Sequence, residues 1–94
     1  MLNGKQKRLL RGLANPIKPI TQIGKDGLSM NFYKSIEDAF NTHELIKVNI
    51  LKTCELDPNL MAIEICANCH CEFVQKIGRT FVFYKKAKEP KIIL

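Results

Sequence analysis

The sequence predicts a mixed α/β (α+β) domain with the element order αβαβαββ, in which helices pack on a small four-stranded mixed sheet. Two observations carry this prediction. Three segments repeat apolar residues at the period of a helix, and four shorter segments read as strands. The chain has 94 residues, which suits one hydrophobic core. We therefore expect a single domain over residues 1–94, with a basic tail over 86–94.

The first helix is predicted over residues 3–13. Asn15-Pro16 ends it, because a residue that precedes proline avoids the helical region of backbone conformation. A short extended segment over 19–23 follows. Helical spacing places on one side of this helix the residues Gln6, Leu9, Leu10 and Leu13.

The second and third helices have clear starting residues. Ser29 is a favoured N-cap, and Asp57-Pro58 combines a capping carboxylate with a proline in the first turn. The second helix is the clearest one, because Phe32, Ile36, Ala39, Phe40 and His43 recur in it at helical spacing. The same reasoning predicts for the inner face of the third helix Leu60, Ile63, Cys66 and Ala67.

The remaining segments read as strands. Residues 45–51 alternate as a strand with one buried face does. Residues 73–77 and 80–85 form two strands, and Gly78-Arg79 between them is short enough for a tight hairpin. In the last strand Phe81 and Phe83 face opposite to Val82 and Tyr84. Because both faces are apolar, we expect this strand in the centre of the sheet.

A G-x-x-G loop, Gly24-Lys25-Asp26-Gly27, lies between the first predicted strand and the second helix. Glycines allow a sharp turn and a close approach of another backbone. The helix that follows directs free N–H groups and its positive dipole end toward the loop, which favours phosphate. KH-type modules clamp a nucleic-acid backbone with such a loop. The motif alone is weak, and its significance depends on the surrounding charge.

Charge is sorted along the chain, whose formal net charge is +6. Residues 1–25 carry six lysines or arginines and no acid, and residues 76–94 carry six against one acid. Residues 26–75 carry three against eight acids. If the two ends meet in space, they form one basic face that attracts polyanions. A merely soluble, lysine-rich surface is the simpler alternative, and the coincidence with the loop favours the polyanion interpretation.

Other features bound the class of protein. The apolar runs are too short to span a membrane, and the N-terminus lacks the pattern of a secretory signal. The N-terminal segment shares the charge of an organelle transit peptide but is poor in serine, so we assign it to the fold. We expect a cytoplasmic protein, a monomer, with no membrane partner and no small-molecule substrate.

The order of short motifs along nearly the whole chain resembles the CRM domain family, in its free-standing YhbY-type form, a ribosome-associated RNA-binding protein. The motifs are specific in combination. They are Lys5-Gln6-Lys7, Leu10-Arg11-Gly12-Leu13-Ala14, Pro16-Ile17-Lys18-Pro19, Ile23-Gly24-Lys25-Asp26-Gly27-Leu28, His43-Glu44-Leu45-Ile46-Lys47-Val48, Gln75-Lys76-Ile77-Gly78-Arg79-Thr80 and Phe83-Tyr84.

The resemblance implies a fold similar to the C-terminal domain of translation initiation factor three. It also implies binding of ribosomal RNA and association with precursors of the large ribosomal subunit. The chain departs from the family at Cys69-His70, where a Thr-Gly pair usually ends the third helix. Glycine is the usual left-handed cap, and histidine adopts that conformation at some cost. The departure affects the local turn and leaves the fold prediction unchanged.

The segment Cys66-Ala67-Asn68-Cys69-His70-Cys71 gives a competing signal. C-x-x-C-H is the attachment pattern of c-type haem, but nothing indicates export. A structural zinc site would use Cys66 and Cys69, with His70, Cys71 or Cys54 completing a tetrahedron, but no second C-x-x-C is present. A redox dithiol is disfavoured at the end of a helix. We therefore predict partly buried cysteines in a reducing compartment, with no metal and no cofactor.

No catalytic group is predicted, so we expect no enzyme. Cys69 and His70 are adjacent in sequence only, and Glu37 and Asp38 point apart on their helix. Two alternatives to a specific RNA-binding protein remain, namely a ribosome-docking adaptor that acts through protein contacts and a generic nucleic-acid module. The predicted RNA-binding residues are Gly24, Lys25, Asp26 and Gly27 in the loop, together with Lys5, Lys7, Arg8, Arg11, Lys18, Arg79 and Lys85.

Overall fold

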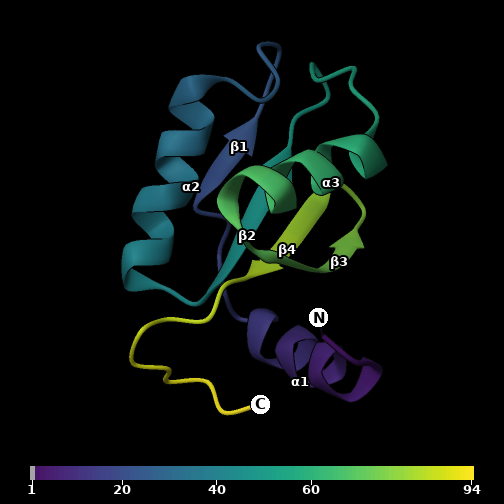
Figure 1. Ribbon diagram of the computed structural model, residues 1–94. Coiled ribbons are helices and arrows are strands. Elements are labelled where there is room, and N and C mark those ends of the chain that lie inside the picture. The colour runs from purple at the N-terminus through teal and green to yellow at the C-terminus, as the bar shows by residue number, and fades with distance from the viewer. Residues whose placement is uncertain (1) are drawn as a thin grey trace.

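The computed structural model describes residues 2–94 and has the predicted element order (Figure 1). The three helices and four strands alternate as the apolar pattern indicated, so the αβαβαββ prediction is confirmed. Their bounds are α1 Gly4–Ala14, β1 Thr21–Ile23, α2 Met30–Thr42, β2 Leu45–Ile50, α3 Pro58–Cys69, β3 Glu72–Ile77 and β4 Thr80–Tyr84.

The strands form one mixed sheet in the order β1-β2-β4-β3. β1 and β2 are parallel, with Ile23 opposite Ile50, whereas β4 is antiparallel to both β2 and β3. β4 is a central strand, as the apolar residues on both of its faces predicted. A register shift between Phe73 and Gln75 marks a bulge in β3, which increases the local twist.

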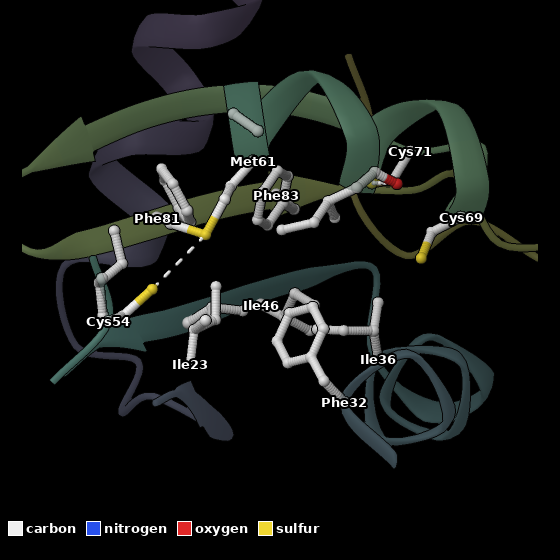
Figure 2. Packing of buried hydrophobic residues seen from close by; sticks show 14 residues of the cluster. Ile23, Phe32, Ile36, Ile46, Cys54, Met61, Cys69, Cys71, Phe81 and Phe83 are labelled. Carbon is white, nitrogen blue, oxygen red and sulfur yellow. Dashed lines mark hydrogen bonds between the residues drawn. The ribbon is translucent and has the colours of Figure 1, made fainter. Parts of the chain in front are cut away.

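Helices α2 and α3 cover one face of the sheet and enclose the main core (Figures 1 and 2). Phe81 and Phe83 of β4 pack edge to face with Phe73. Phe32 and Ile36 of α2 close the core from one side, and α3 closes it from the other. The residues that α3 contributes are Met61, Ala62, Ile65 and Cys69.

Helix α1 lies on the opposite face and covers only one end of it. Leu10 and Ala14 are fully buried there. The sheet residues that they contact lie at the start of β2, at the end of β4 and in the bulge of β3, and they are Leu45, Val74, Val82 and Tyr84. The other end of this face has no helix on it.

The predicted helix starts are confirmed. Ser29 Oγ accepts the N–H of Phe32 at 3.1 Å, and Asp57 Oδ1 accepts the N–H of Asn59 at 3.0 Å. At α1, Asn3 is the N-cap and exchanges bonds with Gln6 in a capping box. Capping satisfies N–H groups that a helix cannot pair internally, and thereby fixes where each helix begins.

Two predicted helix faces are wrong. In α3, Leu60 and Ile63 are 62% and 66% exposed, and Ala67 is exposed as well. This helix is apolar on several sides, so spacing alone does not select the buried one. In α1, Leu9 and Leu13 are largely exposed, because the helix packs on a narrow part of the sheet and buries only the stripe that contains Leu10 and Ala14.

His70 adopts the left-handed conformation that the Cys69-His70 departure predicted, with φ 53° and ψ 45°. It is the only non-glycine residue with positive φ among residues 2–94. A side chain in this region costs about 1–2 kcal/mol. The turn joins α3 to β3, so this cost is tolerated where the chain must reverse into the sheet.

We expect His70→Gly to raise the free energy of unfolding by about 0.5–1 kcal/mol. Relief of the left-handed strain outweighs the greater freedom of glycine in the unfolded chain. Urea denaturation followed by circular dichroism measures the change. His43→Gly is the matched control, because His43 caps α2 with φ −130° and should gain nothing. An unchanged or lower unfolding midpoint for His70→Gly would contradict this account of the turn.

Candidate nucleic-acid interface

The G-x-x-G loop is a tight turn that joins β1 to α2. The N–H of Gly27 donates to the carbonyl of Gly24 at 3.0 Å, and the N–H of Ser29 donates to the carbonyl of Gly27 at 3.1 Å. Lys25 and Asp26 at the tip are exposed. The buried side chain of Ile23 holds the preceding strand in the core. The loop therefore projects from a fixed base and presents its backbone outward.

The two glycines meet different requirements. Gly27 is buried and has φ 64°, and a Cβ there would lie 2.7 Å from Leu56 Cδ1. Gly24 has an ordinary φ, and its Cβ would make van der Waals contact with Leu51 at 3.4 Å. Gly27 is thus needed to form the turn, whereas Gly24 has room for a small side chain, which would lie against Leu51 and Thr53.

A hollow of about 250 Å³ lies between the loop and the first turns of α2. Ser29 satisfies the N–H of Phe32, whereas the N–H groups of Met30 and Asn31 have no acceptor within residues 2–94. The dipole of a helix favours negative charge at this end. The hollow offers an anion backbone donors and a positive end, and the exposed Lys25 lies at its rim.

A second segment, which sequence reasoning missed, lies beside the loop. The N–H of Leu51 donates to the carbonyl of Ile23 at 2.8 Å, and Thr53 Oγ1 would lie 3.8 Å from a Cβ at Gly24. Residues 51–57 therefore run next to the loop, as Figure 1 shows at the top of the molecule. The exposed Lys52 lies in this segment. No local sequence signal indicates it, because the pairing of β1 with β2 brings it there.

Arg79, predicted as an RNA-binding residue, has protein partners in this region. Its Nε donates to the carbonyl of Ile50 at 2.9 Å, and its NH2 nitrogen donates to the carbonyl of Leu51 at 2.6 Å. The guanidinium satisfies two carbonyls at the end of β2. Arg79 thereby fixes the start of the segment that lies beside the loop, and its remaining N–H groups are near the interface.

The basic helix α1 lies at the other end of the sheet from the loop (Figure 1). The loop follows Ile23, which is opposite Ile50, whereas α1 packs against Leu45 at the start of β2. A six-residue strand spans about 17 Å at 3.3 Å per step. The predicted basic residues therefore do not form one compact cluster with the loop. On α1, Lys5, Arg8 and Arg11 are exposed and Lys7 is half-buried.

The two ends of the chain meet, which was the condition for one basic face. Ile92 packs against the α1 core, and Gln6 and Lys86 share a hollow with residues 90–94. Glu44, which is only 7% exposed, holds the tail through Oε1, which accepts the backbone N–H groups of Lys91 and Ile92. The tail thus places its lysines near the basic residues of α1.

The remaining predicted basic residues lie apart from the loop. Lys85 donates from Nζ to the carbonyl of Cys69 at 3.0 Å and lies 5.9 Å from the ring centroid of Phe40. Lys85 thereby satisfies the carbonyl of the last residue of α3. Lys18 is exposed in the connection between α1 and β1. Lys47, which the prediction omitted, reaches from β2 to the carbonyl of Asn15 at 3.4 Å.

The cysteine cluster is divided between different surroundings. Cys54 packs against Met61, with the two sulfurs 3.8 Å apart, at the opposite end of α3 from Cys69 (Figure 2). A hydrogen bond to Cys66 raises the pKa of Cys71, and the same contact lowers the pKa of Cys66. Burial raises the pKa of Cys69. Within residues 2–94, no three Cys, His, Asp or Glu side chains are arranged to hold a metal ion.

No helix in the described part of the chain is long and apolar enough to cross a membrane. The fold is that of a small domain with three helices and a four-stranded mixed sheet. The basic helix α1 at one end, and the loop hollow with its helix N-terminus at the other, make it a candidate polyanion-binding protein. The model of the CRS1 / YhbY (CRM) domain matches residues 2–85. The chain belongs to this family, which confirms the resemblance found in its motifs.

Curated relatives and a solved structure agree with this assignment. The chain is 46% identical over 93 residues to probable RNA-binding protein YqeI of Bacillus subtilis, covering 99% of this chain and 97% of that protein. It is 37% identical to an RNA-binding protein of Haemophilus influenzae, covering 99% and 94%. The solution structure of hypothetical protein SAV1595 from Staphylococcus aureus is similar with TM-score 0.83 and 45% identity, covering 97% and 95%.

We expect Gly27→Ala to destabilise the fold by about 1–2 kcal/mol, because alanine in the left-handed region is strained. Gly24→Ala should change the free energy of unfolding by less than about 0.5 kcal/mol, since its backbone conformation suits any residue. Thermal or urea unfolding of both variants checks the difference. Equal effects would contradict the distinct roles of the two glycines.

Proposed function

We propose that this protein binds structured ribosomal RNA and acts during assembly of the large ribosomal subunit. The observation that carries the proposal is the hollow at the G-x-x-G loop, where free backbone N–H groups, a helix N-terminus and Lys25 converge. Membership of the CRM family and relatives named as RNA-binding proteins support RNA as the polyanion.

At the loop, one phosphate of the RNA backbone enters the hollow and accepts a hydrogen bond from the N–H group of Asn31. Gly24 lines the hollow without a side chain, which lets the sugar-phosphate chain approach the protein backbone. Lys25 adds a charge-assisted contact from the tip. Asp26 is exposed at the tip and also lines the hollow, so its carboxylate opposes an anion there and lies on the side of the hollow away from the bound phosphate.

At the other end, α1 supplies contacts with phosphates through its lysines and arginines. These contacts depend on charge and position, and not on base identity. Lys18 lies in the connection that leads from α1 to β1 and extends the basic surface toward the sheet. The protein thereby contacts two stretches of RNA backbone at once, which suits a folded RNA.

Recognition relies on the shape of RNA, because stacking platforms are scarce. None of the seven aromatic side chains is exposed. Tyr33 accepts a hydrogen bond from Asn68 at 2.9 Å, and Tyr84 is buried against α1. Base-by-base recognition of single strands usually depends on exposed aromatic rings. We therefore infer a preference for structured RNA. We further propose that the protein acts in the cytoplasm as a monomer, associates with ribosomal particles and has no catalytic role.

We expect Lys25→Glu to weaken binding to a structured ribosomal RNA fragment by about tenfold at moderate salt. Lys34→Glu, on the exposed side of α2, should weaken it by about twofold, because it changes net charge equally but lies outside the hollow. Fluorescence anisotropy at several salt concentrations measures both. The salt dependence should decrease more for Lys25→Glu, and equal losses would refute the loop as the anchor.

Sedimentation of a tagged protein from cell lysate at low salt tests the association with ribosomal particles. We expect the wild type to migrate with large-subunit particles, and the Gly24→Asp, Lys25→Glu variant to remain at the top of the gradient. Gly24 is chosen because it lines the hollow and has an ordinary φ, so aspartate there adds negative charge beside the site without backbone strain.

The other outcomes of the gradient discriminate between classes of protein. If the wild type also stays at the top, the ribosomal assignment fails and a generic nucleic-acid module is the better description. If both proteins migrate with particles, a protein contact holds them there and the loop is not the anchor.

A further inference from the structure

Half of one sheet face is open in this structure. Helix α1 covers the face only where Leu45, Val82 and Tyr84 lie, and the connection over residues 15–20 runs past its edge to β1. The end of the face nearest the G-x-x-G loop carries no helix. The open part extends from Lys47 toward the loop along β2, so it lies between helix α1 and the hollow at the G-x-x-G loop.

The open face presents a row of polar side chains. In the strand register Gln22 is opposite Asn49, and Asn49 is opposite Thr80, so the three lie side by side across β1, β2 and β4. Neighbouring strands are about 4.8 Å apart, so the row spans about 10 Å. Gln22 is exposed, and Asn49 and Thr80 are half-buried.

These side chains have unused hydrogen-bonding groups. No partner for the side chains of Gln22, Asn49 or Thr80 exists within residues 2–94. Each amide carries both donors and an acceptor, so these groups are available to a ligand. A hollow of about 360 Å³ lies against Gln22 and Asn49 and is also lined by Pro19 and Ile20.

The charge of the face suits an RNA strand. The described side chains on the open half are Gln22, Lys47, Asn49, Gln75, Ile77 and Thr80, and none is a carboxylate. Lys47 lies on the face, Lys25 lies beyond its loop end, and α1 supplies positive charge at its other end. A polyanion that contacts both α1 and the loop hollow by the direct route crosses the adjacent side-chain amides of Gln22 and Asn49, which we call the amide row.

We propose that the Gln22–Asn49 amide row binds ribose 2′-hydroxyl groups of the bound RNA and makes the protein selective for RNA over DNA. The inference rests on the proposed function and adds to it the groups that distinguish the two nucleic acids. A phosphate in the loop hollow and lysines on α1 contact features that DNA shares. A 2′-hydroxyl is both donor and acceptor, and a side-chain amide offers both complements.

The test compares a short ribosomal RNA hairpin with the same hairpin in which every 2′-hydroxyl is replaced by fluorine. The fluorinated hairpin keeps the charge and the A-form shape but lacks the hydroxyl donor. We expect the wild type to bind the hydroxyl form about five- to tenfold more tightly, which corresponds to one or two hydrogen bonds. Gln22→Met with Asn49→Leu, which conserves size, should remove most of that difference.

The expected change is confined to the hydroxyl form. The double variant should bind it less tightly, while affinity for the fluorinated hairpin stays within about twofold of the wild type. Asn59→Leu, an exposed amide on α3, is the matched control and should retain the selectivity. Unfolding midpoints of the variants show whether each is folded. If the double variant does not fold, the affinities of the wild type for the two hairpins still decide the test.

Three results would overturn the inference. The wild type could bind both hairpins equally, the double variant could retain the selectivity, or it could lose affinity for both forms to the same extent. In each of these cases RNA binding through the loop stands. If the wild type binds neither hairpin, the proposed function itself fails and the inference fails with it.

Discussion

The pairing of β2 with β4 through the middle of the sheet is the interaction on which the rest of this structure depends. β4 carries apolar side chains on both faces, and β2 adds Leu45 to the face that α1 covers, so both faces need some cover. Helices α2 and α3 cover one face, and α1 covers part of the other. The open half of that face needs no helix because its side chains are mostly polar.

The candidate interface is held by groups that do not contact RNA in the proposed mode. Gly27 forms its turn against Leu56, and Ile23 fixes the base of the loop in the core. Arg79 satisfies the last carbonyls of β2 and so positions the segment beside Gly24. A rigid base matters because an anion site made of backbone N–H groups works only when those groups are already oriented.

The tail and the cysteine cluster show how the same chain uses polar groups for structure. A single buried carboxylate, Glu44, binds two backbone N–H groups of the tail and so fixes lysines beside α1. At the end of α3, the carbonyl of Cys69 accepts a hydrogen bond from Lys85, and the free thiols of Cys66 and Cys71 share a hydrogen bond. Both arrangements are internal, and both lie away from the G-x-x-G loop.

Local patterns in the sequence by themselves determined the element order, the helix caps at Ser29 and Asp57, the central position of β4 and the left-handed turn at His70. Each follows from propensity, capping or alternation within a few residues. Tertiary structure alone decided which side of α3 is buried, the partners of Arg79 and Lys85, and the separation of α1 from the loop. These depend on strand register and on contacts between distant residues, which no local pattern encodes.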